Sequence, residues 1–383
     1  MKCMVGSSVN PDAKLAGQEA ATAAKFDGAK VALAYGSVAY DVNAMMVGIT
    51  EALPGIPVIG NTSFTGVVTP EGFANADTGF IGVMTIGGDV VVGAAGLALD
   101  GNARETGRNV ALAALKNAGR TDAPDYFYLA ISSGEEEDYM KGIADIIGRV
   151  PVFGGTAADN SIAGEWLLYE NTTVFDNGVA VAFFWGGEMI NLFTGAYRET
   201  DDVGIITKLD GKRTLVEIDG VSAMEKYSQW THTATNDLAG GNLLSATVTS
   251  PLGVKDRLGD LIAIRHPMNG NEDGSMAIGN NLCEKTAIIR MEASVDELIA
   301  AASDTLVSLR DSLPKKAAGY HLVHCGGRRA GIDARMNEVV EAVMKEAGDV
   351  PFIMEFTFGE YGHTEDHGNT AGGLMLSYTA LLD

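Results

Sequence analysis

Residues 57–62 read Pro-Val-Ile-Gly-Asn-Thr, and residues 151–156 repeat the pattern as Pro-Val-Phe-Gly-Gly-Thr. A second landmark follows each copy, Gly87-Gly88-Asp89 after the first and Gly186-Gly187-Glu188 after the second. Two landmarks in the same order are the mark of an internal repeat. The sequence therefore predicts that one structural unit occurs twice.

The elements expected around the two prolines have the same order. An apolar run, Lys30 to Gly36 or Tyr126 to Gly134, is followed by a helix-like stretch and then by the proline. Each unit thus reads strand, helix, strand, hairpin. We place the two units at residues 30–118 and 125–197.

The first Gly-Gly-acid landmark lies in a long apolar stretch. Gly79 to Leu99 contains 21 residues with one charge, which is long enough to span a bilayer. Its counterpart, Gly178 to Ala196, is broken at the same landmark. Two β-rich runs around Gly-Gly are typical of a β-hairpin with a tight turn, so no membrane span is expected.

Composition restricts the class of protein. The chain has 50 acidic and 27 basic residues, and its net charge of −23 repels phosphate backbones. This acidic protein is therefore not expected to bind nucleic acid. Its three cysteines have no paired spacing, and Met1 to Ala24 lacks an apolar core of signal-peptide length. Both features favour the cytoplasm.

A polar break at Arg198 to Asp202 divides the chain into a first domain, residues 1–200, and a second, residues 201–383. The predicted fold class is mixed α/β, with two domains built around mixed sheets. The second domain uses the same kinds of element, but their order does not align with the first. Ser294 and Glu297 form a capping box at the start of one of its helices, and Met336 to Ala347 is an amphipathic helix.

The turn after the second proline is a candidate binding site. Glycine allows a ligand to approach backbone N–H groups, and the Thr156 hydroxyl and Asp159 carboxylate could add polar contacts to Gly154 and Gly155. The alternative is a turn that needs glycine for its backbone and that Asp159 closes. Both interpretations stay open.

Histidine and cysteine residues allow other chemistries. His363 and His367 are four residues apart, as in some zinc sites, but a loop with flanking glycines is the expected setting. A haem could use one of them, or His266 or His321, as an axial ligand. Cys325 follows His324, but neighbouring strand residues point to opposite faces, so His324 is a poor base for a Cys325 nucleophile.

Five segments, taken in order, resemble the FIST family, which has an N-terminal and a C-terminal FIST domain. They are Ser8-Val-Asn-Pro-Asp-Ala-Lys-Leu-Ala-Gly17, Gly154-Gly-Thr-Ala-Ala-Asp159, Glu217-Ile-Asp-Gly-Val-Ser-Ala223, His324-Cys-Gly-Gly-Arg328, and Phe358-Gly-Glu360 with His367-Gly-Asn-Thr370. The resemblance implies an intracellular sensory protein that binds a small ligand such as an amino acid. It also implies a signalling partner, for example a histidine kinase, a chemotaxis receptor or a cyclic-nucleotide enzyme. One branch of the family binds haem and senses nitric oxide, so haem is an alternative cofactor here. A hydrolase that uses Cys325 is a further alternative.

The end of the chain supplies the second candidate site. Tyr320 to Cys325 and Phe352 onward form an apparent strand–helix–strand unit, which brings the carboxyl ends of both strands to one edge. Arg328 and Glu360 are then expected near each other, and either could instead have a purely structural role. A loop with three further polar residues would close over them: His367, Asn369 and Thr370. Such a set suits an amino-acid-like or anionic ligand.

Overall fold

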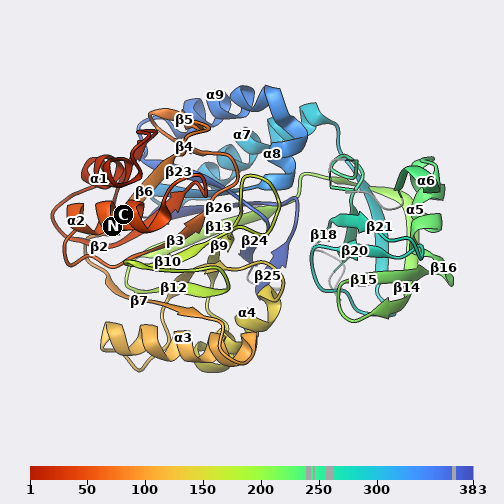
Figure 1. Ribbon diagram of the computed structural model, residues 1–383, viewed down its shortest axis with the longest axis horizontal. Coiled ribbons are helices and arrows are strands. Elements are labelled where there is room, and N and C mark those ends of the chain that lie inside the picture. Colours follow the sequence, from red (N-terminus) through yellow and green to blue (C-terminus); the bar gives the residue numbers. More distant parts are fainter. Residues whose placement is uncertain (239–242, 245, 256–261, 365–367, 383) are drawn as a thin grey trace.

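The chain forms a large body and a smaller lobe that projects from one side of it (Figure 1). The body contains residues 1–197 and 293–382, and the lobe lies within residues 198–292. The computed structural model describes residues 1–238, 243–244, 246–255, 262–364 and 368–382.

The body is built from three units with one order of elements: strand, helix, strand, helix, strand, a short hairpin and a last strand. The first unit is β1 (Lys2–Ser8), α1 (Ala13–Ala23), β2 (Ala29–Gly36), α2 (Val42–Ala52), β3 (Val58–Thr62), β4 (Val67–Thr69), β5 (Gly72–Ala74) and β6 (Ile81–Gly87). The second is β7 (Val91–Ala98), α3 (Ala103–Ala118), β8 (Tyr126–Ile131), α4 (Glu136–Ile147), β9 (Val152–Thr156), β10 (Leu168–Glu170), β11 (Thr173–Phe175) and β12 (Gly178–Trp185). The third is β13 (Glu188–Thr194), α7 (Val295–Ser312), β22 (Ala317–Cys325), α8 (Gly326–Ile332), a 3-10 turn η1 (Asp333–Arg335), α9 (Met336–Ala347), β23 (Phe352–Thr357), β24 (Glu360–Thr364), β25 (Gly368–Gly372) and β26 (Leu376–Leu382).

Three sheets follow from these units, and each borrows a hairpin from another unit. The first sheet has the order β1-β6-β2-β3-β10-β11, the second β7-β12-β8-β9-β24-β25, and the third β13-β26-β22-β23-β4-β5. The first unit therefore receives the hairpin of the second, the second that of the third, and the third that of the first. This cyclic exchange ties the three units into one body.

Equivalent backbone hydrogen bonds occur in all three units, so the body has approximate threefold symmetry. The carbonyl of each proline accepts from the strand beside it: Pro57 from Ala32 at 2.9 Å, Pro151 from Phe127 at 3.0 Å and Pro351 from Tyr320 at 2.9 Å. A ring of bonds also joins the ends of β3, β9 and β23: Ala158 N to Thr62 O, Phe358 N to Thr156 O and Phe64 N to Phe356 O. The two copies predicted from the proline landmarks are present, but the units run from β1 to β6 and from β7 to β12, not over residues 30–118 and 125–197. Pro351 marks a third copy that sequence patterns did not reveal.

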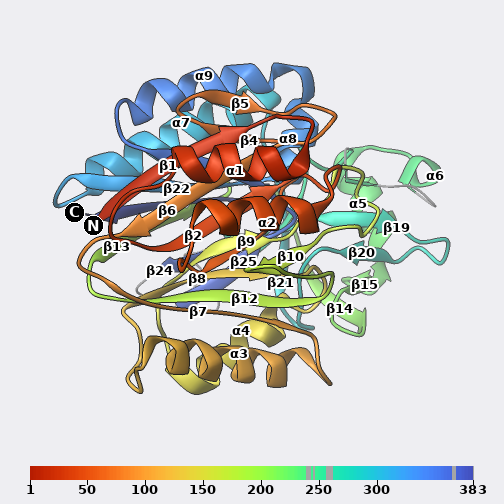
Figure 2. The same cartoon turned by 60° about the vertical axis from the view of Figure 1, so that its left-hand side comes forward.

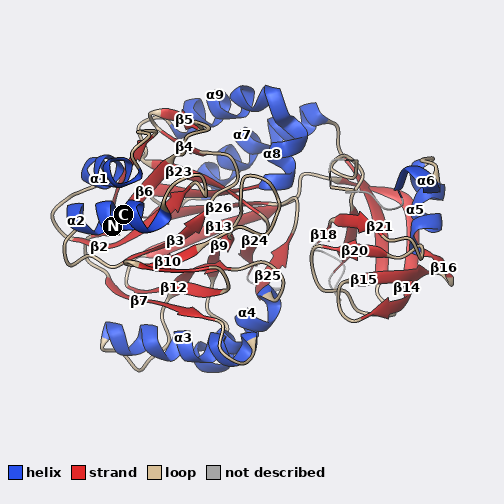
Figure 3. Cartoon of the chain, viewed as in Figure 1, coloured by secondary structure: helices blue, strands red, loops and turns tan. Residues whose placement is uncertain are grey.

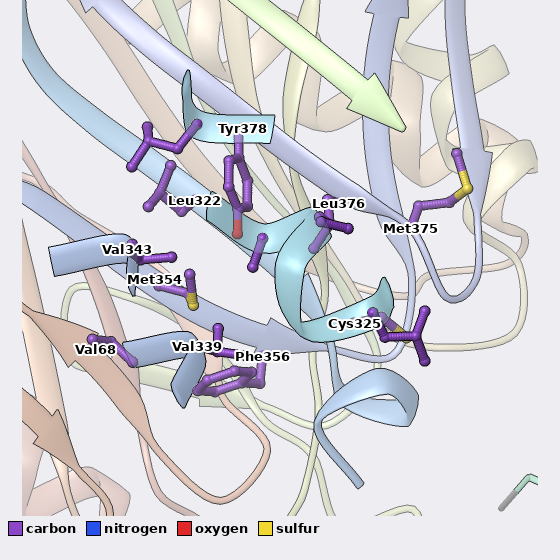
Figure 4. Close-up of a cluster of buried hydrophobic side chains, with 14 of the residues drawn as sticks. Val68, Leu322, Cys325, Val339, Val343, Met354, Phe356, Met375, Leu376 and Tyr378 are labelled. Carbon is purple, nitrogen blue, oxygen red and sulfur yellow. The ribbon is translucent and has the colours of Figure 1, made fainter. Parts of the chain in front are cut away.

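The sheets are buried on both faces. One cluster of apolar side chains fills the space between the three sheets, and three others lie between a sheet and its helix pair, α1 with α2, α3 with α4, or α7 with α9. Figure 2 shows these helix pairs around the outside of the strands, and Figure 4 shows Leu322 and Tyr378 in the cluster with Val339 and Val343 of α9. Strands covered on both faces are nearly continuous apolar runs, which explains why the segment Gly79 to Leu99, which contains β6 and β7, is long and apolar enough to resemble a membrane span.

The hairpin predicted at each Gly-Gly-acid landmark is wrong. β6 pairs with β1 and β2, whereas β7 pairs with β12, so Gly87-Gly88-Asp89 connects strands of different sheets. The same holds for β12 and β13. Because β6 already has a partner strand on each side, β1 and β2, the next strand of the chain pairs in another sheet. The hairpins of the three units are instead β4–β5, β10–β11 and β24–β25.

The lobe is inserted in the third unit, between β13 and α7. Its sheet has the order β18-β17-β21-β14-β15-β20-β19, with β16 on β15, and the lobe contains more strand than helix (Figure 3). The elements are β14 (Arg198–Asp210), β15 (Thr214–Ile218), β16 (Val221–Ser222), α5 (Ala223–Thr231), α6 (Thr235–Leu238), β17 (Leu252–Lys255), β18 (Ile262–Arg265), β19 (Pro267–Gly270), β20 (Met276–Ile278) and β21 (Ala287–Glu292).

The pairing of the strands does not follow the domain boundary that the sequence predicts at residue 200. Strands from both sides of residue 200 pair in the second and third sheets, since β24 pairs with β9 and β13 pairs with β26. The residues after 293 thus lie with the first part of the chain. Among the helices of the described residues, none is both long and apolar enough to cross a membrane.

Candidate functional site

A cavity of about 390 Å³ lies where the lobe meets the body, and we call it the interlobe cavity. The body contributes residues that follow β8, β9, β22 and β23, and the lobe contributes residues around β18, β19 and β20. Carboxyl ends of parallel strands are a common place for ligand sites in α/β folds. The lining residues are Ser133, Ile162, Ala163, Gly164, Trp166, Leu244, His266, Met268, Gly279, Asn280, Cys325, Gly327, Phe358 and Gly373.

Two glycines of the body allow the lobe to approach closely. A Cβ atom at Gly327 would lie 2.8 Å from Leu374 Cδ2 and 3.3 Å from His266 Cε1. A Cβ at Gly373 would lie 3.5 Å from His266 Cβ and 3.6 Å from Asn280 Oδ1. Glycine at these positions therefore brings His266 and Asn280 against the ends of the body strands.

The polar groups of the lobe wall are neutral. His266 is buried, its Nε2 lies 3.1 Å from the Leu244 carbonyl, and burial lowers its pKa to about 4. The imidazole is consequently uncharged at neutral pH, and Nε2 donates to that carbonyl. Asn280 is also buried and brings an amide with both donor and acceptor atoms.

Asp159 does not line the interlobe cavity, but it holds the turn that forms the body side of the cavity. Its carboxylate accepts from the backbone N–H groups of Ser161, Ala163, Gly164 and Glu165 at 2.8–3.2 Å. Burial alone would raise the pKa of Asp159, but these four groups outweigh it and hold the pKa below its usual value. In this structure Asp159 closes a turn, and the turn presents Ile162, Ala163 and Gly164 to the cavity.

The strand before that turn is occupied by sheet pairing. Gly154 and Gly155 pair with Tyr361 and Glu360 of β24, and the Thr156 hydroxyl lies 2.6 Å from the Tyr361 hydroxyl. These three residues are buried and do not line the interlobe cavity. The structure thus brings Gly155 next to Glu360, but as neighbours in a sheet.

Arg328 is fully buried and is held by backbone carbonyls. Its Nη1 donates to Gly195 O at 2.8 Å and its Nη2 to Leu298 O at 2.9 Å. Gly195 precedes the lobe and Leu298 follows it. The guanidinium therefore fixes the two ends of the connection between lobe and body.

Glu360 is buried nearby with two partners of its own. Its carboxyl accepts from the Thr357 hydroxyl at 3.0 Å and from Met375 N at 2.9 Å. Burial raises the pKa of Glu360 to about 8, so it holds a proton at neutral pH. Within the described part of the chain it has no ion pair with Arg328, whose donors go to backbone carbonyls, and neither residue lines the interlobe cavity.

The remaining candidates lie elsewhere. Asn369 Oδ1 accepts a hydrogen bond from His363 Nδ1 at 2.7 Å, and the Asn369 amide nitrogen donates to Val150 O. Asn369 and Thr370 line a second cavity, next to α4. His367 lies outside the described residues. Over the described ranges, no group of three or more His, Cys, Asp and Glu side chains is arranged to hold a metal ion.

Sequence reasoning singled out two residues that line the interlobe cavity, Cys325 as a candidate nucleophile and His266 as a candidate haem ligand, and it missed Asn280 and Ser133. Ser133 follows the strand Tyr126–Ile131, so the rule on carboxyl ends of strands could have identified it. His266 and Asn280 carried no such signal, because only the docking of the lobe brings them to the body.

The three cysteines differ in access, which gives a first prediction. Cys3 and Cys325 are buried and Cys283 is exposed. Burial raises the pKa of Cys3 to about 12, and burial together with the nearby Glu360 raises the pKa of Cys325 well above its usual value. A maleimide reagent at pH 7 should therefore modify one thiol per folded chain, at Cys283.

Mass spectrometry of the intact protein and its peptides measures this outcome. Cys283→Ser should remain unmodified until the chain is unfolded. Rapid modification of Cys325 in the folded Cys283→Ser variant would contradict the prediction and would favour a reactive thiol. The adjacent His324 is no activating base, because burial lowers its pKa to about 3 and its Nδ1 lies 3.0 Å from the Cys325 carbonyl.

Comparison with known proteins adds the family. Residues 30–221 match the FIST N domain, and residues 223–363 match the FIST C domain. The chain belongs to the FIST family. FIST domains are associated with small-ligand sensing in signalling proteins. Among curated proteins, none matches this chain.

Two solved structures are similar to this FIST protein at a low level. Cyanuric acid hydrolase from A. caulinodans is 10% identical over 100% of this chain and 99% of its own, with a TM-score of 0.35. Phosphoribosylformylglycinamidine synthase II from Thermotoga maritima is 11% identical over 99% of this chain and 72% of its own, with a TM-score of 0.23. At these TM-scores neither protein bears on the fold or the chemistry of the FIST chain.

Proposed function

We propose that this FIST protein is a sensor whose small-molecule ligand occupies the interlobe cavity. The observation that carries the proposal is that the lobe and the body each supply one wall, so that a bound molecule contacts both. A ligand that contacts two parts of a protein stabilises the arrangement in which both walls meet. The position of the lobe is then the signal.

The lining of the cavity favours a compact, uncharged ligand. Trp166, Phe358 and Met268 offer apolar surface, while Asn280 and Ser133 offer neutral hydrogen-bonding groups. Among the described lining residues, none is charged at neutral pH. An amino-acid-like ligand, expected from the family resemblance, would need its charges solvated or paired by groups other than Arg328 and Glu360.

Location and partner are part of the same proposal. The cysteine pattern and the acidic surface fit a cytoplasmic protein that passes its signal to a partner. A histidine kinase, a chemotaxis receptor or a cyclic-nucleotide enzyme would read the position of the lobe. Haem, the alternative ligand, would be detected by a Soret absorption band in the purified protein.

A ligand screen tests the site. We expect at least one compound among the twenty free amino acids and their uncharged N-acetyl amides to raise the melting temperature saturably. Asn280→Leu should weaken the affinity for that compound by roughly tenfold, because one buried hydrogen-bonding group is removed. Isothermal titration calorimetry measures the affinity. The matched control is Asn269→Leu, at an exposed position of β19, which should bind as well as the wild type.

Two results would contradict the proposal. One is the absence of saturable binding in both classes of compound. The other is an unchanged affinity in a folded Asn280→Leu variant, which would move the ligand away from the interlobe cavity.

A further inference from the structure

The second cavity, also of about 390 Å³, concentrates positive charge in a protein of net charge −23. It lies between α4 and the strand β25 of the body and the strand β18 of the lobe. Three of its lining residues are cations, and we call it the basic cavity. It is lined by Glu137, Met140, Lys141, Ala144, Gly148, Arg149, Arg265, Gly368, Asn369, Thr370 and Ala371.

The one acidic side chain in this lining is already neutralised. Glu137 Oε2 lies 2.6 Å from Arg213 Nη2, and its Oε1 accepts from Asn281 N at 2.9 Å. Lys141 pairs with Asp138, at an exposed position. Within the described residues Arg149 has no ion pair and no hydrogen bond, so its charge is available to a molecule in the cavity.

Arg265 brings a guanidinium from the lobe with unused donors. Its Nη1 donates to the carbonyls of Ile264 and Ala371 at 3.1 and 3.2 Å. Its Nε is buried and has no hydrogen-bond partner among the described residues. Burial lowers the pKa of Arg265 to about 10, which leaves it charged at neutral pH. Its Nη2 makes no hydrogen bond to the described residues, and an oxyanion in the cavity would supply an acceptor for this group.

The backbone of β25 is shaped around the other arginine. Gly368 has φ of +75°, and a Cβ atom there would lie 2.8 Å from Arg149 Nη2. A side chain at this position would therefore displace the guanidinium. Next to it, Asn369 and Thr370 add neutral polar groups to the lining.

We propose that the basic cavity binds a small doubly charged oxyanion, with Arg149 of the body and Arg265 of the lobe as its ligands. Phosphate-bearing and dicarboxylate metabolites share this chemistry. A guanidinium binds either group through two parallel hydrogen bonds. Because the two arginines belong to different parts of the protein, the bound anion ties the lobe to the body. The site is separate from the interlobe cavity and does not depend on the function proposed for it.

Titration calorimetry with inorganic phosphate and with malonate, at constant ionic strength set by sodium chloride, tests the site. We expect saturable binding of one or both, and the tighter of the two identifies the kind of metabolite. Arg149→Gln should reduce that affinity by roughly tenfold or more, since one charge-assisted pair is lost. Arg310→Gln is the control, because Arg310 is an exposed arginine of α7 paired with Glu346.

Other variants keep the test decisive. Arg265→Gln should also lose binding, and if its loss of two backbone contacts unfolds the chain, Arg149→Gln alone carries the result. Asn280→Leu should retain the full affinity for the anion, which separates this site from the interlobe cavity. The proposal is overturned if neither anion binds more tightly than chloride, or if Arg149→Gln binds as tightly as the wild type.

Discussion

Arg213→Ala should destabilise the protein by about 3 kcal/mol at pH 7, the low end of the cost of breaking a buried ion pair. Arg213 lies on the turn between β14 and β15 of the lobe, and its Nη2 reaches Glu136 Oε2 at 2.5 Å and Glu137 Oε2 at 2.6 Å on α4. The Glu136 side chain is 3% exposed. Without Arg213, two carboxylates would remain at the junction without their common cation.

The pH dependence gives the prediction a second test. Burial, despite Arg213, already raises the pKa of Glu136. Removal of the cation raises it further, so Glu136 can take up a proton in the folded variant at a pH where it is ionised in the unfolded chain. Protonation relieves the repulsion, and the loss of stability should therefore shrink as the pH falls from 7 to 5. Urea unfolding at both pH values measures it.

Lys212→Ala is the matched control beside Arg213. Lys212 pairs with Asp138 of the same helix at 2.6 Å, but its side chain is 58% exposed. An exposed ion pair contributes about 0–1 kcal/mol, so this variant should unfold close to the wild type. An equal loss of unfolding free energy in Arg213→Ala and Lys212→Ala would contradict the prediction, because it would show that the burial of Glu136 does not strengthen its ion pair with Arg213. Hydrogen exchange should locate the Arg213→Ala effect at α4 and the β14–β15 turn.

The sequence predicts those parts of the fold that depend on local patterns. The capping box of Ser294 and Glu297 is present at the start of α7, and α9 spans Met336–Ala347 as the amphipathic pattern indicated. In each case neighbouring residues alone determine the backbone, so no tertiary information is needed.

The third unit could not be found by pattern alone. Its proline is present, but Met354 stands where the first two units have Gly60 and Gly154. The lobe also separates β13 from α7, so the unit is not continuous in the sequence. The three units are recognised as equivalent by their backbone hydrogen bonds, such as those of Pro57, Pro151 and Pro351, and not by their side chains.

A local sequence pattern predicts a strand but does not predict which strand it pairs with. The β-rich runs around Gly87-Gly88 are strands as predicted, yet they lie in different sheets. The same limit applies to the site. Arg328 follows a strand end as expected, but the carbonyls of Gly195 and Leu298, which are distant in sequence, take its donors. His266 and Asn280 reach the interlobe cavity through the docking of the lobe, which no local signal records.

Gly154→Ala should destabilise the protein by about 2–5 kcal/mol, from overpacking and from backbone strain together. Gly154 has φ of +127°, and a Cβ atom there would lie 2.1 Å from Leu129 O in the neighbouring strand. Since β8 and β9 are parallel strands in the centre of the second sheet, neither can move without disturbing the strands on both sides. Thermal and urea unfolding measure the loss.

A second glycine separates strain from steric conflict. Gly134 has φ of +123°, close to the φ of Gly154, but a Cβ atom there meets nothing within 4 Å. Gly134→Ala should therefore cost only the strain, about 1–2 kcal/mol. The first unit offers a parallel test, because a Cβ atom at Gly60 would lie 1.9 Å from Ala34 O, the position equivalent to Leu129 O. If the units are equivalent in packing, Gly60→Ala should lose as much stability as Gly154→Ala. A Gly154→Ala variant no less stable than Gly134→Ala would mean that the two strands can separate, and that glycine is kept at Gly154 for another reason.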